Sequence, residues 1–350
     1  MREDVQALID PARLAAHLEA HLPGGVPGPL AVERHLAGHS NETFFLRAGS
    51  SEWVLRRPPR GAFLPTAHDV GREFRVLSAL SSTPVRVPRP LLMCADAEVI
   101  GAPFYVMERV AGVVLRSELP EPFASDVSAR GRIGEELVDA LAELHDVDWR
   151  GVGLEGFGKP VGYLDRQIRR WRGQLALTEP LTRGVEDLHR VGTWLEERVP
   201  TTGAATIVHG DYKLDNVMIA PETPTALVAI LDWEMSTLGD PLADLGWMLS
   251  FWREPSDPIE LTLDEQTVTR EPGFSTREDL VARYARRSGR EVGLDRLPFY
   301  LVLAVWKLAI LLEGSYARHL AGVTDDPFFA HMEEGVPALA ARAWRLTRGE

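Results

Sequence analysis

The sequence predicts an α+β protein with two lobes, a small N-terminal lobe around an antiparallel sheet and a larger, mainly helical C-terminal lobe. Three observations lead to this fold class. The chain has 350 residues, more than one compact core usually organises. Strand-type patterns dominate from about residue 32 to residue 107, and helical periodicity dominates after Gly112. We expect residues 1–109 to form the N-terminal lobe and residues 110–350 the C-terminal lobe.

The N-terminal lobe is predicted to hold a leading helix, a sheet and one further helix. Asp10 and Pro11 have the residue types of an N-cap and a first helical position. The stretch "TFFLRAGSSEWVLRR" contains two strand-type runs joined by a short turn, which predicts a hairpin. In "PTAHDVGREFRVLSAL", Thr66 and Asp69 form a candidate capping pair before an apolar helical stripe. "PFYVMERVAG" then predicts a strand that ends in a polar turn.

In the C-terminal half, a polar loop between two short strands interrupts the helical pattern. One apolar stripe predicts an amphipathic helix, with Ile133, Leu137, Leu141 and Leu144 on one face. The loop lies in "IVHGDYKLDNVMI", and "PETPT" turns the chain back into "ALVAILDWE". The apolar stretch of residues 299–314 is too short for a membrane span and carries Lys307 at its middle, so we expect a core helix.

The composition excludes several classes of protein. Hydrophobic residues make up 45% and charged residues 25%, as in ordinary globular proteins. A net charge of -13 argues against a nucleic-acid partner, because phosphate neutralisation needs clustered cations. The single cysteine, Cys94, follows an apolar run and is interpreted as a buried apolar residue. With no signal-peptide pattern at the N-terminus, we expect a cytoplasmic protein without a membrane partner.

The polar loop holds the residue types that phosphoryl transfer needs. That chemistry requires a carboxylate to orient and deprotonate a hydroxyl, oxygen ligands for magnesium, and cations against the transferring phosphate. Asp211 would be the base, Asn216 a magnesium ligand, and Asp232, after the following strand pair, the anionic metal ligand. An HGD tripeptide alone would more often be a turn, but the ordered set of three is far more specific.

"HGDYKLDN", followed by "ILDWEMSTLGDPLADLG", resembles the aminoglycoside phosphotransferase branch of the protein-kinase-like fold. The sequence is most similar to a subgroup of kinase domains fused to, or encoded beside, acyl-CoA dehydrogenases. The resemblance runs from "GHSNETFFL" to "WKLAILLEGSYAR" and covers nearly the whole chain. It implies a bilobal kinase-like fold that uses ATP and Mg²⁺. It also implies phosphorylation of 4-hydroxy acyl groups on coenzyme A, a step that prepares them for β-oxidation.

The resemblance also implies roles for residues of the N-terminal lobe. Glu73 matches the helix glutamate that braces a phosphate-contacting cation, and Arg56 occupies the position where the family has lysine. Val54 and Arg56 share one strand face, which would place an apolar side chain under the adenine and a cation over the phosphates. The phosphate-covering loop would be "AGHSNETF", with Gly38, Ser40 and Asn41, although it has one glycine where such loops have three. The adenine-binding hinge matches Glu108 and Val110.

Further residues are candidates for supporting the loop or for binding the acceptor. Lys213 lies two residues after Asp211, where serine/threonine kinases have a lysine facing the transferring phosphate, so the resemblance implies that it neutralises charge there. Aminoglycoside kinases more often have histidine at that position. The side chain of His209 would hold the loop by bonding nearby backbone groups. Asp240 and Asp244 would support the loop, although helix capping alone explains Asp240. Arg166, Arg169 and Arg170 form a cation cluster, either an exposed salt-bridged face or a contact with an anionic acceptor. Trp306 and Lys307 are candidates for the acceptor pocket.

The sequence therefore predicts a kinase that transfers the γ-phosphate of ATP to the hydroxyl of a small molecule, and the resemblance implies a hydroxyacyl-CoA or a hydroxy acid as that acceptor. Two alternatives stay open. An aminoglycoside kinase would bind a polycation, in keeping with the net charge of -13. A nucleotide-binding module without catalysis would explain Arg56 and the glycine-poor loop.

Overall fold

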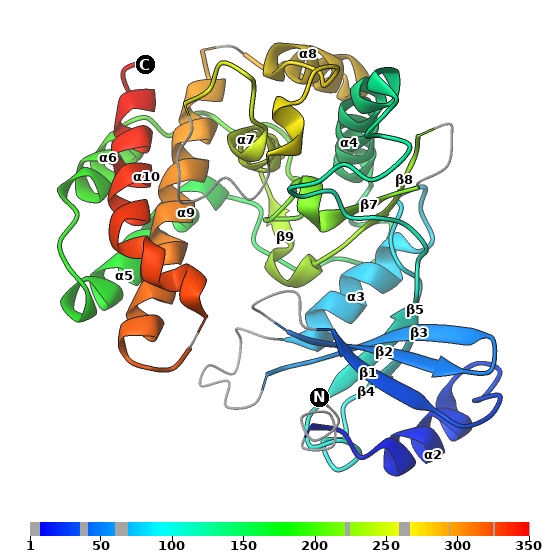
Figure 1. Cartoon of the computed structure of the whole chain (residues 1–350). Helices are drawn as coiled ribbons and strands as arrows, with labels where there is room; N and C mark the ends of the chain where they lie inside the picture. The colour runs from blue at the N-terminus through cyan, green and yellow to red at the C-terminus, as the bar shows by residue number, and fades with distance from the viewer. Residues whose placement is uncertain are drawn as a thin grey trace. The chain divides into compact units, whose positions relative to one another are not determined.

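The computed structural model describes residues 8–35, 41–59, 69–220, 225–258, 267–293, 295–324 and 326–349. The chain divides into two compact units, whose elements are labelled in Figure 1. The N-terminal unit consists of Met1–Gly112 together with Arg150–Leu154 and Val228–Ser236. The C-terminal unit consists of Val113–Trp149, Glu155–Leu227 and Thr237–Glu350.

The N-terminal unit contains, within its described residues, an antiparallel five-stranded sheet in the order β1-β2-β3-β5-β4. Its strands are β1 (Ala31–His35), β2 (Glu42–Ala48), β3 (Ser51–Arg57), β4 (Pro90–Cys94) and β5 (Phe104–Glu108). The predicted hairpin is confirmed, since β2 pairs with β3 from Ala48 and Ser51 onward. Gly49 in its turn has φ +58°, a left-handed conformation that glycine adopts without strain.

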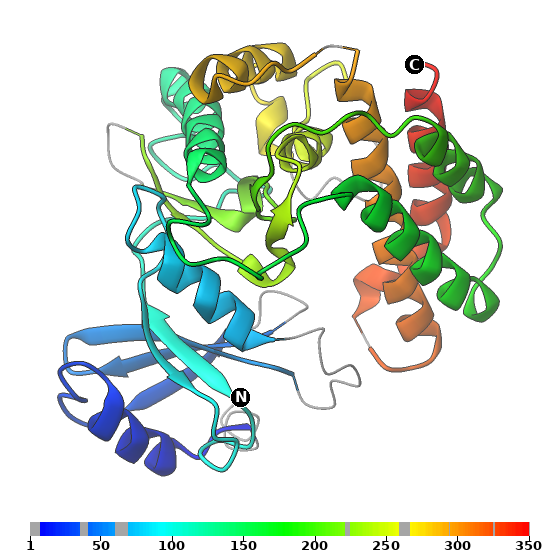
Figure 2. The ribbon, with the colours of Figure 1, turned by 180° about the vertical axis from the view of Figure 1, so that it is seen from behind.

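Two helices cover opposite faces of this sheet, as both views show (Figures 1 and 2). Helix α2 (Pro11–His21) begins at Asp10, which accepts hydrogen bonds from two backbone N–H groups as predicted. Its buried leucines join a core with the alternate residues of the strands, such as Leu55 and Val106. Helix α3 (Val70–Leu80) begins at the N-cap Asp69 and packs against β4 and β5. Thr66, the other member of the predicted capping pair, lies outside the described residues.

The C-terminal unit is mainly helical. Its helices are α4 (Val127–Asp146), α5 (Tyr163–Thr178), α6 (Glu186–Glu197), α7 (Leu242–Phe251), α8 (Arg277–Ser288), α9 (Leu297–Leu320) and α10 (Met332–Leu346). Strand β6 (Thr206–Val208) pairs with β9 (Thr237–Gly239), and β7 spans Val217–Ile219. Strand β8 (Leu227–Ile230) belongs from Val228 on to the N-terminal unit. The predicted apolar stripe of α4 is confirmed, because all four of its residues are fully buried.

Helix α9 runs through the C-terminal unit and packs against α5, α6, α7 and α10 (Figure 1). It has 24 residues, and its length and composition alone would allow it to cross a membrane. The expectation that this segment is too short was wrong, because the helix continues six residues beyond Gly314 to Leu320. In its most apolar window, 56% is buried against the rest of the unit, which is typical of a core helix.

Candidate active site

A buried carboxylate from α7 fixes the backbone of the loop between β6 and β7. The two oxygens of Asp244 accept hydrogen bonds from the backbone N–H groups of His209, at 2.6 Å, and of Gly210, at 2.8 Å. Gly210 has φ +86°, a conformation that would strain any other residue. The loop can therefore hold both N–H groups toward one carboxylate because glycine stands at this position.

Asp244 is only 1% exposed and stays ionised through the groups around it. Burial would raise its pKa, but contacts with His145 and His209 and the N–H of Gly210 hold the pKa below the ordinary value. His145 lies 3.4 Å from Asp244 and also bonds the hydroxyl of Tyr284. The support that Asp244 was expected to give the loop is therefore present as two backbone hydrogen bonds.

The carboxylate of Asp211 is held by one donor on each oxygen. The indole N–H of Trp247 donates to one oxygen at 2.7 Å, and the side-chain amide of Asn216 donates to the other at 2.7 Å. The same amide donates to the backbone carbonyl of Asp211 at 2.8 Å. Asp211 is thus fixed in orientation while part of its side chain remains exposed to solvent, as a general base requires.

Trp247 was not predicted from the sequence. The signal that could have found it is helical spacing, since Trp247 lies one turn after Asp244 on α7 and faces the same loop. Lys213 lies beside the base as the sequence suggested, with its Nζ 3.7 Å from Asp211 and 3.4 Å from Asp215. It also lies 4.8 Å above the ring of Phe251.

In the N-terminal unit, Arg56 and Glu73 form the ion pair that the sequence predicted. An Arg56 guanidinium nitrogen lies 2.9 Å from Glu73, and Tyr105 donates its hydroxyl to the same carboxylate at 2.8 Å. Asn41 donates its amide to the other oxygen of Glu73. Asn41, predicted to contact phosphates, therefore uses its side-chain donor to hold Glu73. Arg56 also reaches Asp232 at 3.2 Å.

These buried groups control one another's charge. Burial would lower the pKa of Arg56, but Glu73, Tyr105 and Asp232 raise it well above the ordinary value, so the guanidinium stays charged. Burial raises the pKa of Glu73, while Arg56, Tyr105 and Asn41 oppose that shift. With donors on both of its oxygens, we expect Glu73 to be a carboxylate at neutral pH.

Asp232 has an unusual backbone conformation and a free oxygen. Its φ of +62° is left-handed, which costs energy in a residue other than glycine and is often found at functional sites. Arg56 contacts one oxygen of Asp232, and the other has no partner among the described residues. In the C-terminal unit, Asn216 donates its amide N–H groups to Asp211, and its side-chain oxygen has no hydrogen-bond partner among the described residues. Carboxylate and amide oxygens of this kind suit Mg²⁺.

The other predicted residues fall into several groups. The Nδ1 of His209 accepts the backbone N–H of Asp211 at 3.2 Å, which supports a structural role. Asp240 accepts the N–H of Leu242, the first residue of α7, and the hydroxyl of Tyr300, so it ties the start of α7 to α9. Glu108 ends β5 and pairs with Arg89. Val110 follows and is partly buried. Gly38 and Ser40 lie outside the described residues.

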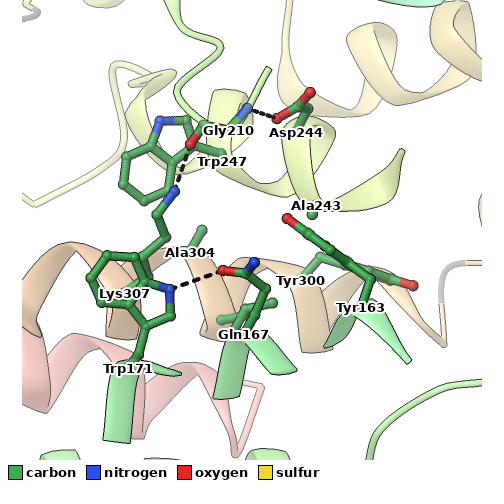
Figure 3. Close-up of a pocket in the computed structure, with 11 residues that line it drawn as sticks. Tyr163, Gln167, Trp171, Gly210, Ala243, Asp244, Trp247, Tyr300, Ala304 and Lys307 are labelled. Atoms are coloured by element: carbon green, nitrogen blue, oxygen red, sulfur yellow. Dashed lines mark hydrogen bonds between the residues drawn. The ribbon is translucent and has the colours of Figure 1, made fainter. Parts of the chain in front are cut away.

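A small pocket lies beside the loop in the C-terminal unit (Figure 3). It encloses about 350 Å³ of space, including the part open to solvent. Three helices and the loop line it, through Tyr163, Gln167 and Trp171 of α5, Ala243, Asp244 and Trp247 of α7, Tyr300, Leu303, Ala304 and Lys307 of α9, and Gly210.

The pocket contains one of the five candidate acceptor residues. Lys307 lines it, whereas Trp306 is fully buried and donates its indole N–H to the backbone carbonyl of Leu188 on α6. None of the three predicted arginines of α5 lines it either. Arg166 donates to the backbone carbonyls of Lys159 and Val161. Arg169 and Arg170 are exposed, and another face of α5 forms the pocket wall.

The fold and the loop define the class of the protein as a kinase-like phosphotransferase. A family model described as "Phosphotransferase enzyme family" matches residues 31–291. The chain therefore belongs to the phosphotransferase enzyme family. The predicted kinase-like fold is confirmed by a solved structure from Ralstonia eutropha, provisionally described as an aminoglycoside phosphotransferase. The two are 32% identical with a TM-score of 0.81, over 97% of this chain and 98% of that one.

Two further comparisons give one relative by sequence and one similar fold. It is 37% identical to acyl-CoA dehydrogenase family member 11 of Rattus norvegicus over 357 residues, covering 99% of this chain and 45% of that protein. The chain thus spans less than half the length of this relative. A spectinomycin phosphotransferase, solved with ADP and spectinomycin, shares the fold with a TM-score of 0.61 at 12% identity, over 96% of this chain and 98% of that one.

The ion pair of Arg56 and Glu73 leads to a prediction about stability. Glu73→Gln leaves a buried guanidinium with less compensation, and we expect a loss of about 3 kcal/mol in unfolding free energy. Glu52→Gln is the matched control, because Glu52 pairs with Arg47 on the exposed end of the β2–β3 hairpin, where surface pairs contribute little. Urea denaturation followed by circular dichroism measures both. Equal losses in the two variants would contradict the account.

Proposed function

We propose that this protein is an ATP- and Mg²⁺-dependent kinase that transfers the γ-phosphate to a hydroxyl group of a small molecule. The observation that carries the proposal is the carboxylate of Asp211, which is oriented by Trp247 and Asn216 in a loop fixed by Asp244. Two donors on one partly exposed carboxylate hold it in place. Membership of the phosphotransferase family supports phosphoryl transfer as the reaction in which this carboxylate acts.

In the proposed reaction, Asp211 orients the acceptor hydroxyl and takes its proton as the oxygen attacks the γ-phosphorus. The bond from that phosphorus to the bridging oxygen breaks, and ADP leaves with the electron pair. Lys213, with its Nζ 3.7 Å from Asp211, would balance negative charge on the transferring group. Its contacts with Asp215 and Phe251 restrict where the ammonium can move.

We assign the metal to Asn216 and Asp232. Each offers a side-chain oxygen without a partner among the described residues. Mg²⁺, when bound, would neutralise charge on the phosphates. Because the amide N–H groups of Asn216 bond Asp211, the rotation of its side chain is already set. Asn216 thus orients the base Asp211 and, at the same time, fixes the direction of its own side-chain oxygen.

The nucleotide is assigned to one face of the N-terminal sheet. In the strand register, Val54 lies between Phe45 and Met107, and Arg56 lies between Thr43 and Tyr105. The apolar trio would contact adenine, and Arg56, braced by Glu73, would reach phosphate oxygens. Arginine can bind phosphate through two N–H groups where the family has lysine. The ADP found in the spectinomycin phosphotransferase supports a nucleotide in this fold.

For the acceptor, we propose a hydroxyacyl-CoA or a hydroxy acid. The similarity to acyl-CoA dehydrogenase family member 11 supports an acyl substrate. The pocket beside the loop supports it as well, since Lys307 is a cation and both oxygens of the lining carboxylate, Asp244, are used by backbone N–H groups. An aminoglycoside, being a polycation, would need free carboxylates there.

The experiment that tests the function is incubation with γ-labelled ATP, Mg²⁺ and a panel of hydroxyacyl-CoAs, hydroxy acids and aminoglycosides. We expect labelled acyl product with the wild type, and a loss of at least about 1,000-fold in Asp211→Ala, because the hydroxyl then has neither its orienting group nor its base. Nucleotide binding without transfer by either protein would indicate a binding module. Transfer to aminoglycosides alone would overturn the acyl proposal.

Trp247 should affect catalysis without contacting the acceptor hydroxyl. Trp247→Phe removes one donor from Asp211, and we expect kcat to fall by roughly 10- to 100-fold with little change in the KM for ATP. Trp252→Phe is the control, because it removes another indole hydrogen bond, to Ser275, after the same helix. If both variants lose kcat equally, the loss reflects general destabilisation and the positioning role fails.

A further inference from the structure

Lys307 holds an ammonium group in the pocket without an ion pair among the described residues. Its Nζ donates to the backbone carbonyl of Gly210 at 2.5 Å and lies 3.9 Å from the centre of the Trp247 ring. The ring of Trp171 is 5.9 Å away on the other side, as Figure 3 shows. An ammonium has three N–H donors, so two remain for a ligand.

Other donors face the same space. Gln167 accepts the indole N–H of Trp171 with its carbonyl oxygen at 3.2 Å, which leaves its amide N–H groups without a partner in the described part of the chain (Figure 3). The hydroxyl of Tyr163 has no described hydrogen bond, and burial raises its pKa far above the ordinary value, so it also keeps its proton. The polar groups of this pocket that have no partner among the described residues are therefore mainly hydrogen-bond donors.

We propose that Lys307 and Gln167 bind an acyl oxygen of the acceptor, and that Lys307 thereby selects hydroxyacyl compounds over simple alcohols and amino sugars. The inference rests on the proposed kinase function and deepens it by assigning specificity to named residues. An acyl oxygen here means a carboxylate oxygen or a thioester carbonyl oxygen, because both accept hydrogen bonds.

The position of the pocket explains why this contact would matter for catalysis. Gly210, whose carbonyl holds Lys307, precedes the base Asp211 in the loop. The indole of Trp247 contacts Lys307 through its ring face and Asp211 through its N–H. An acceptor held by Lys307 would therefore have its chain close to the base, which helps to place the hydroxyl.

The size and the walls of the pocket limit what can enter. The roughly 350 Å³ of the pocket includes open solvent, and its enclosed part has room for about one water-sized group. It would therefore take the acyl oxygen, while the rest of the acceptor and coenzyme A would lie outside it. The ammonium of Lys307 also disfavours a polycation in this pocket, because like charges repel.

The test compares two kinds of acceptor in the full-length protein. The acyl acceptors are a hydroxy acid and, as a separate substrate, its coenzyme A thioester. The comparison acceptor is a diol of the same chain length, which lacks the acyl oxygen. Lys307→Met should lower kcat/KM for the acyl acceptors by roughly 10- to 100-fold, mainly through KM, and change the diol less than about 3-fold. Lys307→Arg, which keeps the charge, should recover part of the loss. The acid and the thioester tested separately show which oxygen is recognised.

Gln167→Leu and a pH series guard against a variant that fails to fold. Gln167→Leu leaves the contact of Lys307 with Gly210 intact and should lower kcat/KM for the acyl acceptors several-fold. Burial lowers the pKa of Lys307 to about 8, a shift that Asp211 and Asp244 limit and that Arg170 and Lys213 increase. The wild-type KM for the acyl acceptor should therefore rise as pH passes 8, and the KM of Lys307→Arg should not.

Three results would overturn the proposal. Lys307→Met could lower kcat equally for the acyl acceptor and the diol with KM unchanged, which would mean that Lys307 only positions the loop. Alternatively, Gln167→Leu could leave kcat/KM for the acyl acceptors unchanged while the wild-type KM for these acceptors stays constant through pH 8. Wild-type preference for the diol would also contradict it. Failure to transfer phosphate to any hydroxyl compound counts instead against the kinase function itself.

Discussion

The arrangement of the site depends on the carboxylate of Asp244, which binds two consecutive backbone N–H groups. Buried N–H groups need acceptors, and a loop between two three-residue strands has few of its own. Asp244 supplies both from the first turn of α7, where Trp247 follows one turn later and bonds Asp211. One helix face therefore sets both the path of the loop and the direction of its base.

The N-terminal unit solves a related problem with different residues. Arg56 is a buried cation, and such a charge is tolerated only when it is paired and hydrogen bonded. Glu73 supplies the countercharge, and Tyr105 and Asn41 satisfy the rest of that carboxylate. The guanidinium stays charged and still reaches Asp232, whose left-handed backbone is held in the same unit. The side chains around Arg56 thus accommodate a buried guanidinium at this position.

The sequence predicted what local patterns encode, including the β2–β3 hairpin and the capping residues Asp10 and Asp69, and the resemblance to kinases implied the pairing of Arg56 with Glu73. It could not show which face of α5 or α9 meets the loop, because both helices are apolar or charged on several sides. Trp306 and Lys307 are neighbours about 100° apart on a helix, and only Lys307 faces the pocket. Trp247 was missed because tryptophan on an apolar helix is read as core, and its indole N–H finds Asp211 only after folding.

Hydrogen exchange of the loop in Asp244→Asn tests the central claim most directly. His209 and Gly210 bond different oxygens of Asp244, and in asparagine an NH2 group replaces one of these oxygens, so one of the two amides faces a donor and loses its partner. We expect the backbone amides of residues 207–216 to exchange roughly 10- to 100-fold faster than in the wild type, while those of α10 keep their wild-type rates. Unchanged exchange in this loop would contradict the view that Asp244 fixes it.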